Sequence, residues 1–241
     1  MHALIINGSP RIKKYSNTDK ILSEFTEGMR ESGTTFEQFE VSNRRQWDTI
    51  REKFETAEHI LIAIPLYFEC IPGLLVEFLE TLTPRSLSKS TVPGDVSEST
   101  SELVNGSAAA KKPTMSFILQ GGFGEGAQLR CGEAYLKILA GKLGCNYGGT
   151  LVKGDNFSIR FDETQRDRVA KPYREMGRIY GRDSAFEAEE CKAFTGPEIF
   201  PAYIRLLVGV LFKTVVKKGF NKMAADWGCT RPLTDRPYES R

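Results

Sequence analysis

Short apolar runs separated by helix-length segments are the feature that most constrains the fold of this chain. The runs cover Ala3 to Ile6, Ile60 to Ile64, Met115 to Leu119 and, more weakly, Thr150 to Val152. Continuous apolar runs of this length are typical of strands in a parallel sheet whose two faces are both covered by helices. The pattern therefore predicts a doubly wound α/β sheet.

A further strand and the connecting helices follow from the segments between these runs. Phe36 to Val41 alternates in polarity, which indicates a more exposed strand near a sheet edge. Asn17 to Glu31 carries apolar residues at the spacing of one helical face, which predicts the first crossover helix. We expect further helices at about 46–57, 73–82 and 127–143.

The segment 85–112 departs from this pattern, because it is rich in Ser, Thr, Gly and Pro and nearly free of large apolar residues. Such a segment cannot bury enough surface to fix itself, so we expect a long mobile insertion. It is either functional, for example a lid, or disordered filler. Both readings remain open from the sequence.

The composition changes after the last apolar run. Charged helical segments are expected at about 162–181 and 183–193, followed by a more apolar segment from Ile199 to Phe220. The sequence therefore predicts a sheet domain over 1–153 and a mostly helical C-terminal extension over 154–241.

Charge and termini exclude several functional classes. Thirty-three Lys and Arg against thirty-one Asp and Glu leave a net charge of +2, which gives no electrostatic footprint of a nucleic-acid-binding protein. The N-terminal apolar run is too short for a signal peptide, and Leu206 to Phe212 is too short to span a bilayer. We therefore expect a cytoplasmic protein without a transmembrane helix.

The cysteines give no sign of a disulfide framework or a metal site, because they are odd in number and widely spaced. Reduced thiols are the simplest interpretation. We expect Cys70 to be a buried, inert thiol, with a redox-active thiol as the less common alternative. The five are Cys70, Cys131, Cys145, Cys191 and Cys229.

The first apolar run leads into NGSPR at 7–11, and SNT at 16–18 opens the following helix. A helix N-terminus after the first strand of an open α/β sheet is an anion site, and Ser, Thr and Asn add donors to it. The segment lacks both GxGxxG and a P-loop, which favours a terminal phosphate such as that of FMN. The alternative is that Ser16 or Asn17 only caps the helix.

Two more loops follow the strands at Ile60 to Ile64 and Met115 to Leu119. PLYFECIPG at 65–73 places an aromatic pair between prolines, which suits a flat heteroaromatic ring, or else packs on the next helix. QGGFGEG at 120–126 carries four glycines, which allow close approach of a ligand to the backbone, or else mark a mobile loop.

These three motifs, in this order, resemble those of the NADPH-dependent FMN reductase family of flavodoxin-like flavoproteins. The resemblance covers about residues 1 to 153 and implies a five-stranded parallel sheet of order 2-1-3-4-5. It also implies an FMN site and a homodimer that completes the pocket. The long insertion and the C-terminal extension depart from the family and leave the substrate side of the pocket undefined.

The resemblance also assigns roles to individual residues. Residues of the first loop would hold the phosphate, and those of the second and third would flank the flavin ring, with Glu125 as a further neighbour. No side chain is assigned a catalytic role and no metal is expected, because hydride transfer is cofactor chemistry. The predicted cofactor-binding residues are Ser9, Arg11, Ser16, Asn17, Thr18, Pro65, Leu66, Tyr67, Phe68, Gln120, Gly121, Gly122 and Phe123.

The predicted function is that of an FMN-dependent NAD(P)H oxidoreductase. NADPH or NADH would reduce the bound FMN, which would pass the hydride on to a quinone, a flavin or another small acceptor. The alternative is a flavodoxin-type electron-transfer protein that docks with redox partners. A net charge of +2 does not favour this alternative, because flavodoxins are usually strongly acidic.

The tail carries an apolar stripe accompanied by lysines within 199–222. We expect this stripe to pack on the sheet domain or on a second subunit. The alternative is contact with an anionic membrane.

Overall fold

The protein divides into two compact units in the computed structural model, Met1–Glu198 and Ile199–Arg241. The predicted insertion at 85–112 lies almost entirely outside the described residues, as does Phe68. The structure describes residues 1–67, 70–85, 112–160, 163–236 and 238.

The first unit contains a five-stranded sheet in the order β2-β1-β3-β4-β5, and every neighbouring pair of strands is parallel. The predicted strands and their order are confirmed. The three central strands are buried along almost their whole length, which is why their sequences are continuously apolar. The strands are β1 His2–Asn7, β2 Thr35–Glu40, β3 His59–Pro65, β4 Thr114–Gln120 and β5 Asn146–Lys153.

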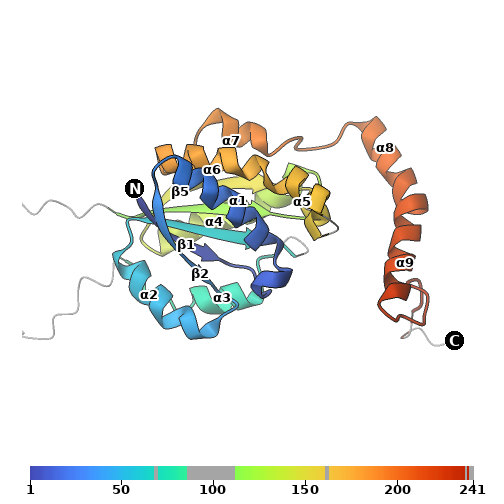
Figure 1. Cartoon of the computed structure of the whole chain (residues 1–241), viewed down its shortest axis with the longest axis horizontal. Coiled ribbons are helices and arrows are strands. Elements are labelled where there is room, and N and C mark those ends of the chain that lie inside the picture. Colours follow the sequence, from blue (N-terminus) through green and yellow to red (C-terminus); the bar gives the residue numbers. More distant parts are fainter. Residues whose placement is uncertain (68–69, 86–111, 161–162, 237, 239–241) are drawn as a thin grey trace, which may run out of the picture. The chain divides into compact units, whose positions relative to one another are not determined.

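Helices cover both faces of the sheet (Figure 1). One core cluster joins α2, α3 and α4 to one face, and the other joins α1, α5, α6 and α7 to the opposite face. The helices of this unit are α1 Asn17–Glu31, α2 Trp47–Thr56, α3 Gly73–Leu79, α4 Arg130–Lys142, α5 Glu163–Ala170, α6 Pro172–Asp183 and α7 Glu189–Phe194. Short 3-10 turns lie at Lys13–Tyr15, Arg44–Gln46, Gly126–Leu129 and Phe157–Arg160.

The expected helices after the last strand differ from the observed ones at two points. Pro172 starts α6 directly after α5, because proline lacks the amide needed inside a helix but fits its first turn. Ser184 ends α6 in a left-handed conformation with φ 60°, so the next helix begins only at Glu189. The segment expected as two helices therefore forms three.

The helices α1 and α6 pack with their backbones in close contact. A Cβ atom on Gly28 would lie 1.9 Å from the carbonyl oxygen of Arg174, and one on Gly177 would lie 1.9 Å from that of Phe25. Because glycine has no Cβ, only glycine permits this approach. The compact unit therefore continues well past residue 153, whereas the predicted boundary at 153 marks the end of the last strand.

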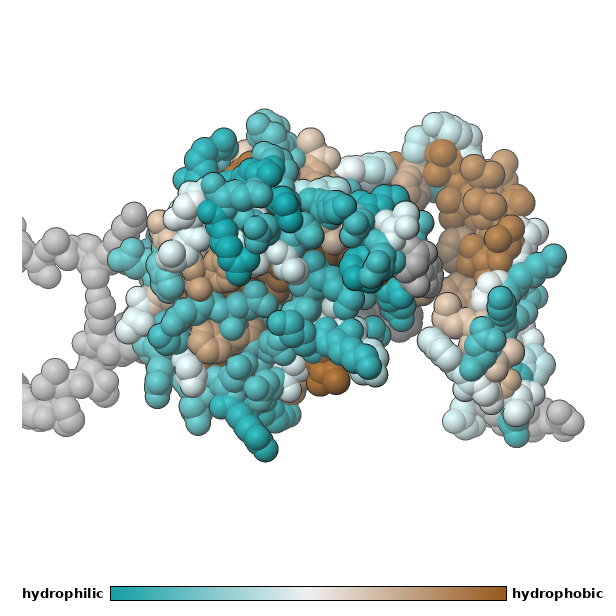
Figure 2. Space-filling model, in the orientation of Figure 1, coloured by the Kyte–Doolittle hydropathy of each residue, from teal (hydrophilic) through white to brown (hydrophobic). Residues whose placement is uncertain are grey.

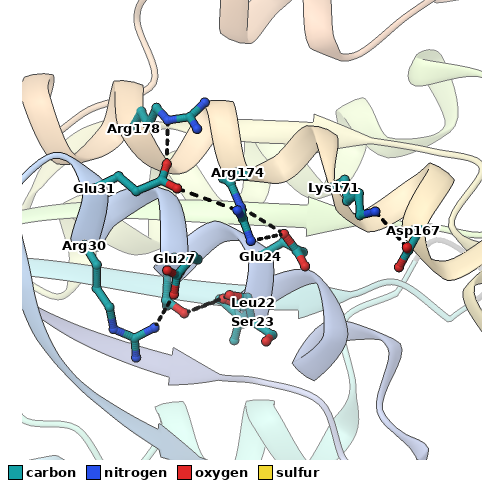
Figure 3. Close-up of polar contacts among 11 residues, drawn as sticks. Leu22, Ser23, Glu24, Glu27, Arg30, Glu31, Asp167, Lys171, Arg174 and Arg178 are labelled. Atoms are coloured by element: carbon teal, nitrogen blue, oxygen red, sulfur yellow. Dashed lines mark hydrogen bonds and ion pairs between the residues drawn. The ribbon is translucent and has the colours of Figure 1, made fainter. Parts of the chain in front are cut away.

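Ion pairs accompany this contact on its exposed side (Figure 3). Arg174 of α6 lies 3.0 Å from Glu24, and Arg178 lies 2.6 Å from Glu31, both carboxylates belonging to α1. Exposed pairs of this kind stabilise by less than about 1 kcal/mol each. Apolar burial between the helices is therefore the main source of stability at this contact.

The second unit consists of α8 Ala202–Leu211, a π-helical turn Phe212–Val216 and α9 Lys217–Asp226. Within the part of the chain that the structure describes, no helix combines the length and apolarity needed to cross a membrane.

Candidate functional site

The loops that follow β1, β3 and β4 leave the sheet at the same edge, because these strands are adjacent and parallel. Backbone hydrogen bonds extend the sheet beyond the strand ends. Gly8 N donates to Ala63 O over 2.8 Å, Leu66 N to Gln120 O over 2.8 Å, and Gly121 N to Lys153 O over 3.1 Å. The structure thus brings the three predicted ligand loops together at the carboxyl ends of the strands, where open α/β sheets bind ligands.

The serines of the first loop are buried, and each hydroxyl oxygen accepts one backbone hydrogen bond. Ser9 Oγ accepts from Arg11 N over 3.3 Å, and Ser16 Oγ accepts from Asp19 N over 3.1 Å, which caps α1. A hydroxyl that accepts in this way keeps its own proton for another acceptor. The capping role expected as an alternative for Ser16 is therefore present and is compatible with donation to an anion.

Thr18 repeats this arrangement with a side-chain donor. Its Oγ1 accepts from Gln120 Nε2 over 3.3 Å, and both residues are buried. This contact joins the first turn of α1 to the end of β4. The N-terminus of the 15-residue α1 adds backbone N–H groups and the positive end of the helix dipole. Donors from hydroxyls and backbone fit an anion such as a phosphate.

Two guanidinium groups belong to the same region. Arg11 lies over the ring of Tyr67, with 5.8 Å from its Cζ to the ring centroid, and Arg160 lies 4.6 Å from the ring centroid of Phe157. Burial and the positive charge of Arg11 lower the pKa of Arg160, whereas Tyr67 raises it, which shows that these groups are close enough to interact. Cationic charge therefore gathers beside the first loop.

One carboxyl group lies in the first turn of α1 and opposes this positive charge. Burial raises the pKa of Asp19, whereas Lys13 and Lys20 lower it. The two lysines offset part of its negative charge.

Asn156 forms hydrogen bonds with residues of both the first and the third loop. It was not among the residues predicted from the sequence. Its N–H donates to Gly121 O over 3.0 Å, and its carbonyl oxygen accepts from Asn17 Nδ2 over 3.1 Å. Its side chain donates to Lys153 O over 2.8 Å and accepts from the hydroxyl of Tyr173 over 3.3 Å. The amide of Asn17 is thus oriented by the protein and keeps a second N–H for a ligand.

Arg160 was missed for the same reason as Asn156, because both residues follow β5 outside the three motifs. The strand order would have indicated these two residues. The carboxyl end of β5 lies at the same edge as that of β4, so polar residues shortly after residue 153 belong among the candidates.

The second loop has its aromatic side chain at the surface. Tyr67 is exposed, Leu66 is half-buried and Pro65 is buried at the end of β3. Tyr67 and Cys70 form an isolated antiparallel bridge, with N–H to O distances of 2.9 and 3.1 Å. Cys70 is exposed, so the expectation of a buried thiol is wrong.

The third loop is held by backbone contacts on two sides. Phe123 O accepts from Asp155 N over 2.8 Å, while Gly126 N donates to Pro197 O over 3.0 Å. Gly121 is buried, whereas Gly122 and Phe123 are exposed. These contacts favour a fixed loop over the mobile loop that the sequence left open as an alternative. They leave Phe123 as a second exposed aromatic side chain at the site.

An ion-pair cluster next to this loop fixes the returning chain. Ala127 N donates to Glu198 O over 3.1 Å, and the guanidinium of Arg130 contacts the carboxylates of both Glu198 and Glu133. The hydrogen bond from Arg130 lowers the pKa of Glu198 below its usual range. The last residues of the first unit therefore help to position the glycine-rich loop.

The sheet order and the convergence of loops after β1, β3 and β4 define a flavodoxin-like protein. Residues 1–115 match the model of the family described as NADPH-dependent FMN reductase. The family resemblance predicted from the motifs is confirmed. The description of this family names FMN and NADPH, the cofactor and one of the two reductants predicted from the motifs.

Solved structures with the same fold are distant in sequence. A flavone reductase is 18% identical with a TM-score of 0.51, and the match covers 76% of this chain and 64% of that one. An FMN-dependent NADH-azoreductase from Bacillus anthracis, solved with FMN, is 17% identical with a TM-score of 0.50, covering 76% and 98%.

An NAD(P)H:quinone oxidoreductase from Methanothermobacter marburgensis is 15% identical with a TM-score of 0.51, covering 76% of this chain and 96% of that one. The chain thus spans less than two thirds of the flavone reductase but nearly all of the other two. At these identities the likeness shows the fold alone. No curated protein sequence matches the chain.

Proposed function

We propose that this protein binds FMN at the carboxyl edge of its sheet and transfers reducing equivalents from NADPH or NADH to a small acceptor such as a quinone or a free flavin. The observation that carries the proposal is the set of hydroxyls around the start of α1. Ser9, Ser16 and Thr18 each accept a hydrogen bond from the protein and retain a proton to donate. A phosphate group, which only accepts when fully ionised, is the complement of such a set.

The proposed phosphate end contains the five residues predicted from the sequence. Ser9, Ser16 and Thr18 supply hydroxyl protons, Asn17 an amide proton, and Arg11 a cation. The hydroxyl-bearing residues are buried, while Asn17 and Arg11 are partly exposed. An entering phosphate would therefore meet Asn17 and Arg11 before it reaches the hydroxyls.

The proposed ring end lies between the second and third loops. Tyr67 and Phe123 offer exposed aromatic faces, and Gly122 leaves the backbone open beside them. The backbone N–H groups of Leu66 and Gly121 donate to Gln120 O and Lys153 O and so extend the sheet, which holds both loops in register. Pro65, Phe68 and Gln120 complete the predicted set, with Gln120 acting through Thr18.

When bound, FMN would supply the hydride chemistry, and the chain would supply binding and orientation. The exposed side chains of Tyr67 and Phe123 would cover the ring from bulk water. The hydrogen bonds of Asn156 to Gly121 and Asn17 would keep the phosphate end and the ring end at a fixed separation. No side chain is required as a nucleophile or as a general base.

An absorbance spectrum of the purified chain mixed with FMN tests the proposal. We expect a protein-bound flavin spectrum that bleaches under anaerobic mixing with NADPH or NADH and returns when a quinone is added. Failure to bind FMN would contradict the proposal. Bleaching by dithionite but not by either nucleotide would instead favour an electron-transfer protein that docks with redox partners.

A homodimer and a cytoplasmic location stay predictions. Sedimentation of the FMN-loaded chain at several concentrations tests the first, and a constant monomer mass would contradict it.

A further inference from the structure

The helix α8 presents apolar side chains around its circumference. No residue of α8 or of the π-helical turn is buried, and Arg205 is the only charged residue of α8. The residues of the second unit therefore do not cover these side chains. A helix that is apolar all round is normally surrounded by an apolar environment. The side chains more than half exposed are Tyr203, Leu206, Leu207, Val210, Phe212 and Val215.

The charges that accompany this helix have one sign. Residues 199–225 contain no Asp or Glu, and four of their five basic residues follow α8. Figure 2 shows the apolar surface over α8 and hydrophilic surface over α9 in the second unit. An apolar segment followed by clustered lysines is complementary to a bilayer with anionic headgroups. The basic residues are Arg205, Lys213, Lys217, Lys218 and Lys222.

The length and the flanking aromatic residues agree with a helix lying in the bilayer surface. The ten residues of α8 extend about 15 Å, roughly half of the hydrocarbon thickness, so α8 cannot span it. Tyr203 lies at the start of α8 and Trp227 directly follows α9, and both side chains are largely exposed. Tyrosine and tryptophan are enriched at the level of the headgroups, where a ring with one polar atom is best solvated.

We propose that α8, the π-helical turn and α9 bind in the plane of an anionic lipid bilayer, with α8 in the boundary of the acyl chains and the lysines among the headgroups. A second copy of this helix is the competing occupant. A helix-to-helix contact would cover only one side of α8 and would bring two cationic segments together, which costs electrostatic energy. An anionic bilayer instead places acyl chains against the apolar side chains and negative headgroups beside the lysines.

Flotation of the full chain with vesicles tests the proposal. We use phosphatidylcholine vesicles with and without phosphatidylserine, at low and high salt. We expect the chain to float with the vesicles that contain phosphatidylserine and to do so less at high salt, because salt screens the lysine–headgroup attraction. Recovery of the chain in the unbound fraction with both vesicles would overturn the proposal.

Matched variants separate the apolar and the cationic contributions. Leu206→Gln with Leu207→Gln should abolish flotation, because these exposed side chains supply the apolar insertion. Lys217→Gln with Lys218→Gln should weaken binding about twenty-five-fold, at roughly fivefold for each lysine near the surface. The control is Lys137→Gln with Lys142→Gln on exposed positions of α4, which changes net charge equally and should float as the wild type does.

Tryptophan fluorescence gives a readout that does not depend on flotation. Trp227 is 72% exposed, whereas Trp47 is 8% exposed, so a blue shift on vesicle binding should come from Trp227 and vanish in Trp227→Phe. If instead the wild type is a dimer that ignores vesicles, and the Leu206 and Leu207 substitutions make it a monomer, the helix is a dimer interface. That result overturns the proposal.

Discussion

The side-chain amide of Gln120 donates a hydrogen bond to the hydroxyl of Thr18 over 3.3 Å, although the two residues are 102 positions apart. Both are buried, at the end of β4 and in the first turn of α1. The contact therefore couples the proposed phosphate end of the site to the proposed ring end.

Thr18→Val keeps the shape of this side chain and removes its hydroxyl. The buried amide of Gln120 then loses its partner, which should lower the free energy of unfolding by about 1–3 kcal/mol. Loss of a donor to the FMN phosphate should also weaken FMN binding about tenfold or more. Urea unfolding of the FMN-free protein and quenching of flavin fluorescence measure the two effects.

Thr26→Val is the control for this substitution. Thr26 is buried in the same helix, but its hydroxyl donates to Leu22 O over 2.8 Å, inside α1. We expect FMN affinity to stay unchanged in Thr26→Val. Equal loss of FMN affinity in both variants would mean that the hydroxyl of Thr18 has no direct role at the phosphate.

Arg160→Gln tests the second guanidinium of the proposed phosphate end. Removal of one exposed cation should weaken FMN binding about fivefold, corresponding to roughly 1 kcal/mol. Riboflavin, which lacks the phosphate, should bind to the variant and the wild type equally. Arg51→Gln in α2, with the same change of charge away from the site, should leave both ligands unaffected. An equal loss for riboflavin would assign Arg160 to the ring end instead.

Gly28→Ala tests the close contact between α1 and α6. The added Cβ would lie 1.9 Å from a backbone oxygen of α6, so the helices must separate, and we expect a loss of about 1–3 kcal/mol or more in the free energy of unfolding. Gly141→Ala in α4 meets nothing within 4 Å and should stabilise by about 0.5–1 kcal/mol. Thermal and urea unfolding of the two variants should therefore shift in opposite directions.

The buried cysteines predict a loss of stability at alkaline pH. Burial raises the pKa of Cys145 and of Cys191 from 9.0 to about 11. Between these values the unfolded thiols ionise while the folded ones stay protonated, so the folded state binds more protons and its stability falls as pH rises. Burial also raises the pKa of Tyr173 and Tyr180, which extends the fall to higher pH.

Urea unfolding under reducing conditions between pH 8 and 11 measures this fall. Cys145→Ala combined with Cys191→Ala should make the fall shallower, whatever its effect on stability at pH 8. An identical pH profile in the double variant would show that the two thiols do not contribute.

The sheet was predictable because its central strands are buried on both faces and are therefore continuously apolar. The arrangement of the first loop was predictable because helix-capping residues and the proposed anion-binding residues must be adjacent in sequence, as Ser16, Asn17 and Thr18 are. Asn156 was not predictable in this way, since its four partners come from α1, the glycine-rich loop, β5 and α6. Only the folded chain brings these partners together.

The role of α6 was also hidden in the sequence. Arg174 and Arg178 make the segment look like a charged, solvent-facing helix, but both pair with carboxylates of α1. The two helices approach most closely at Gly28 and Gly177. The sequence does not show which surface a helical glycine faces, so this contact could not be predicted. Without knowledge of the contact between α1 and α6, the sequence places the domain boundary at 153, directly after the last strand.

The contact between α1 and α6 has a consequence for biosynthesis. The ribosome completes α1 within the first 31 residues, but the helix that covers it ends only at Asp183. Until that point has left the exit tunnel, Phe25 and Met29 lack their α6 neighbours Met176, Ile179 and Tyr180. The apolar side of α1 that faces α6 therefore stays uncovered through most of synthesis, and this is the interval in which a chaperone would be expected to act on the nascent chain.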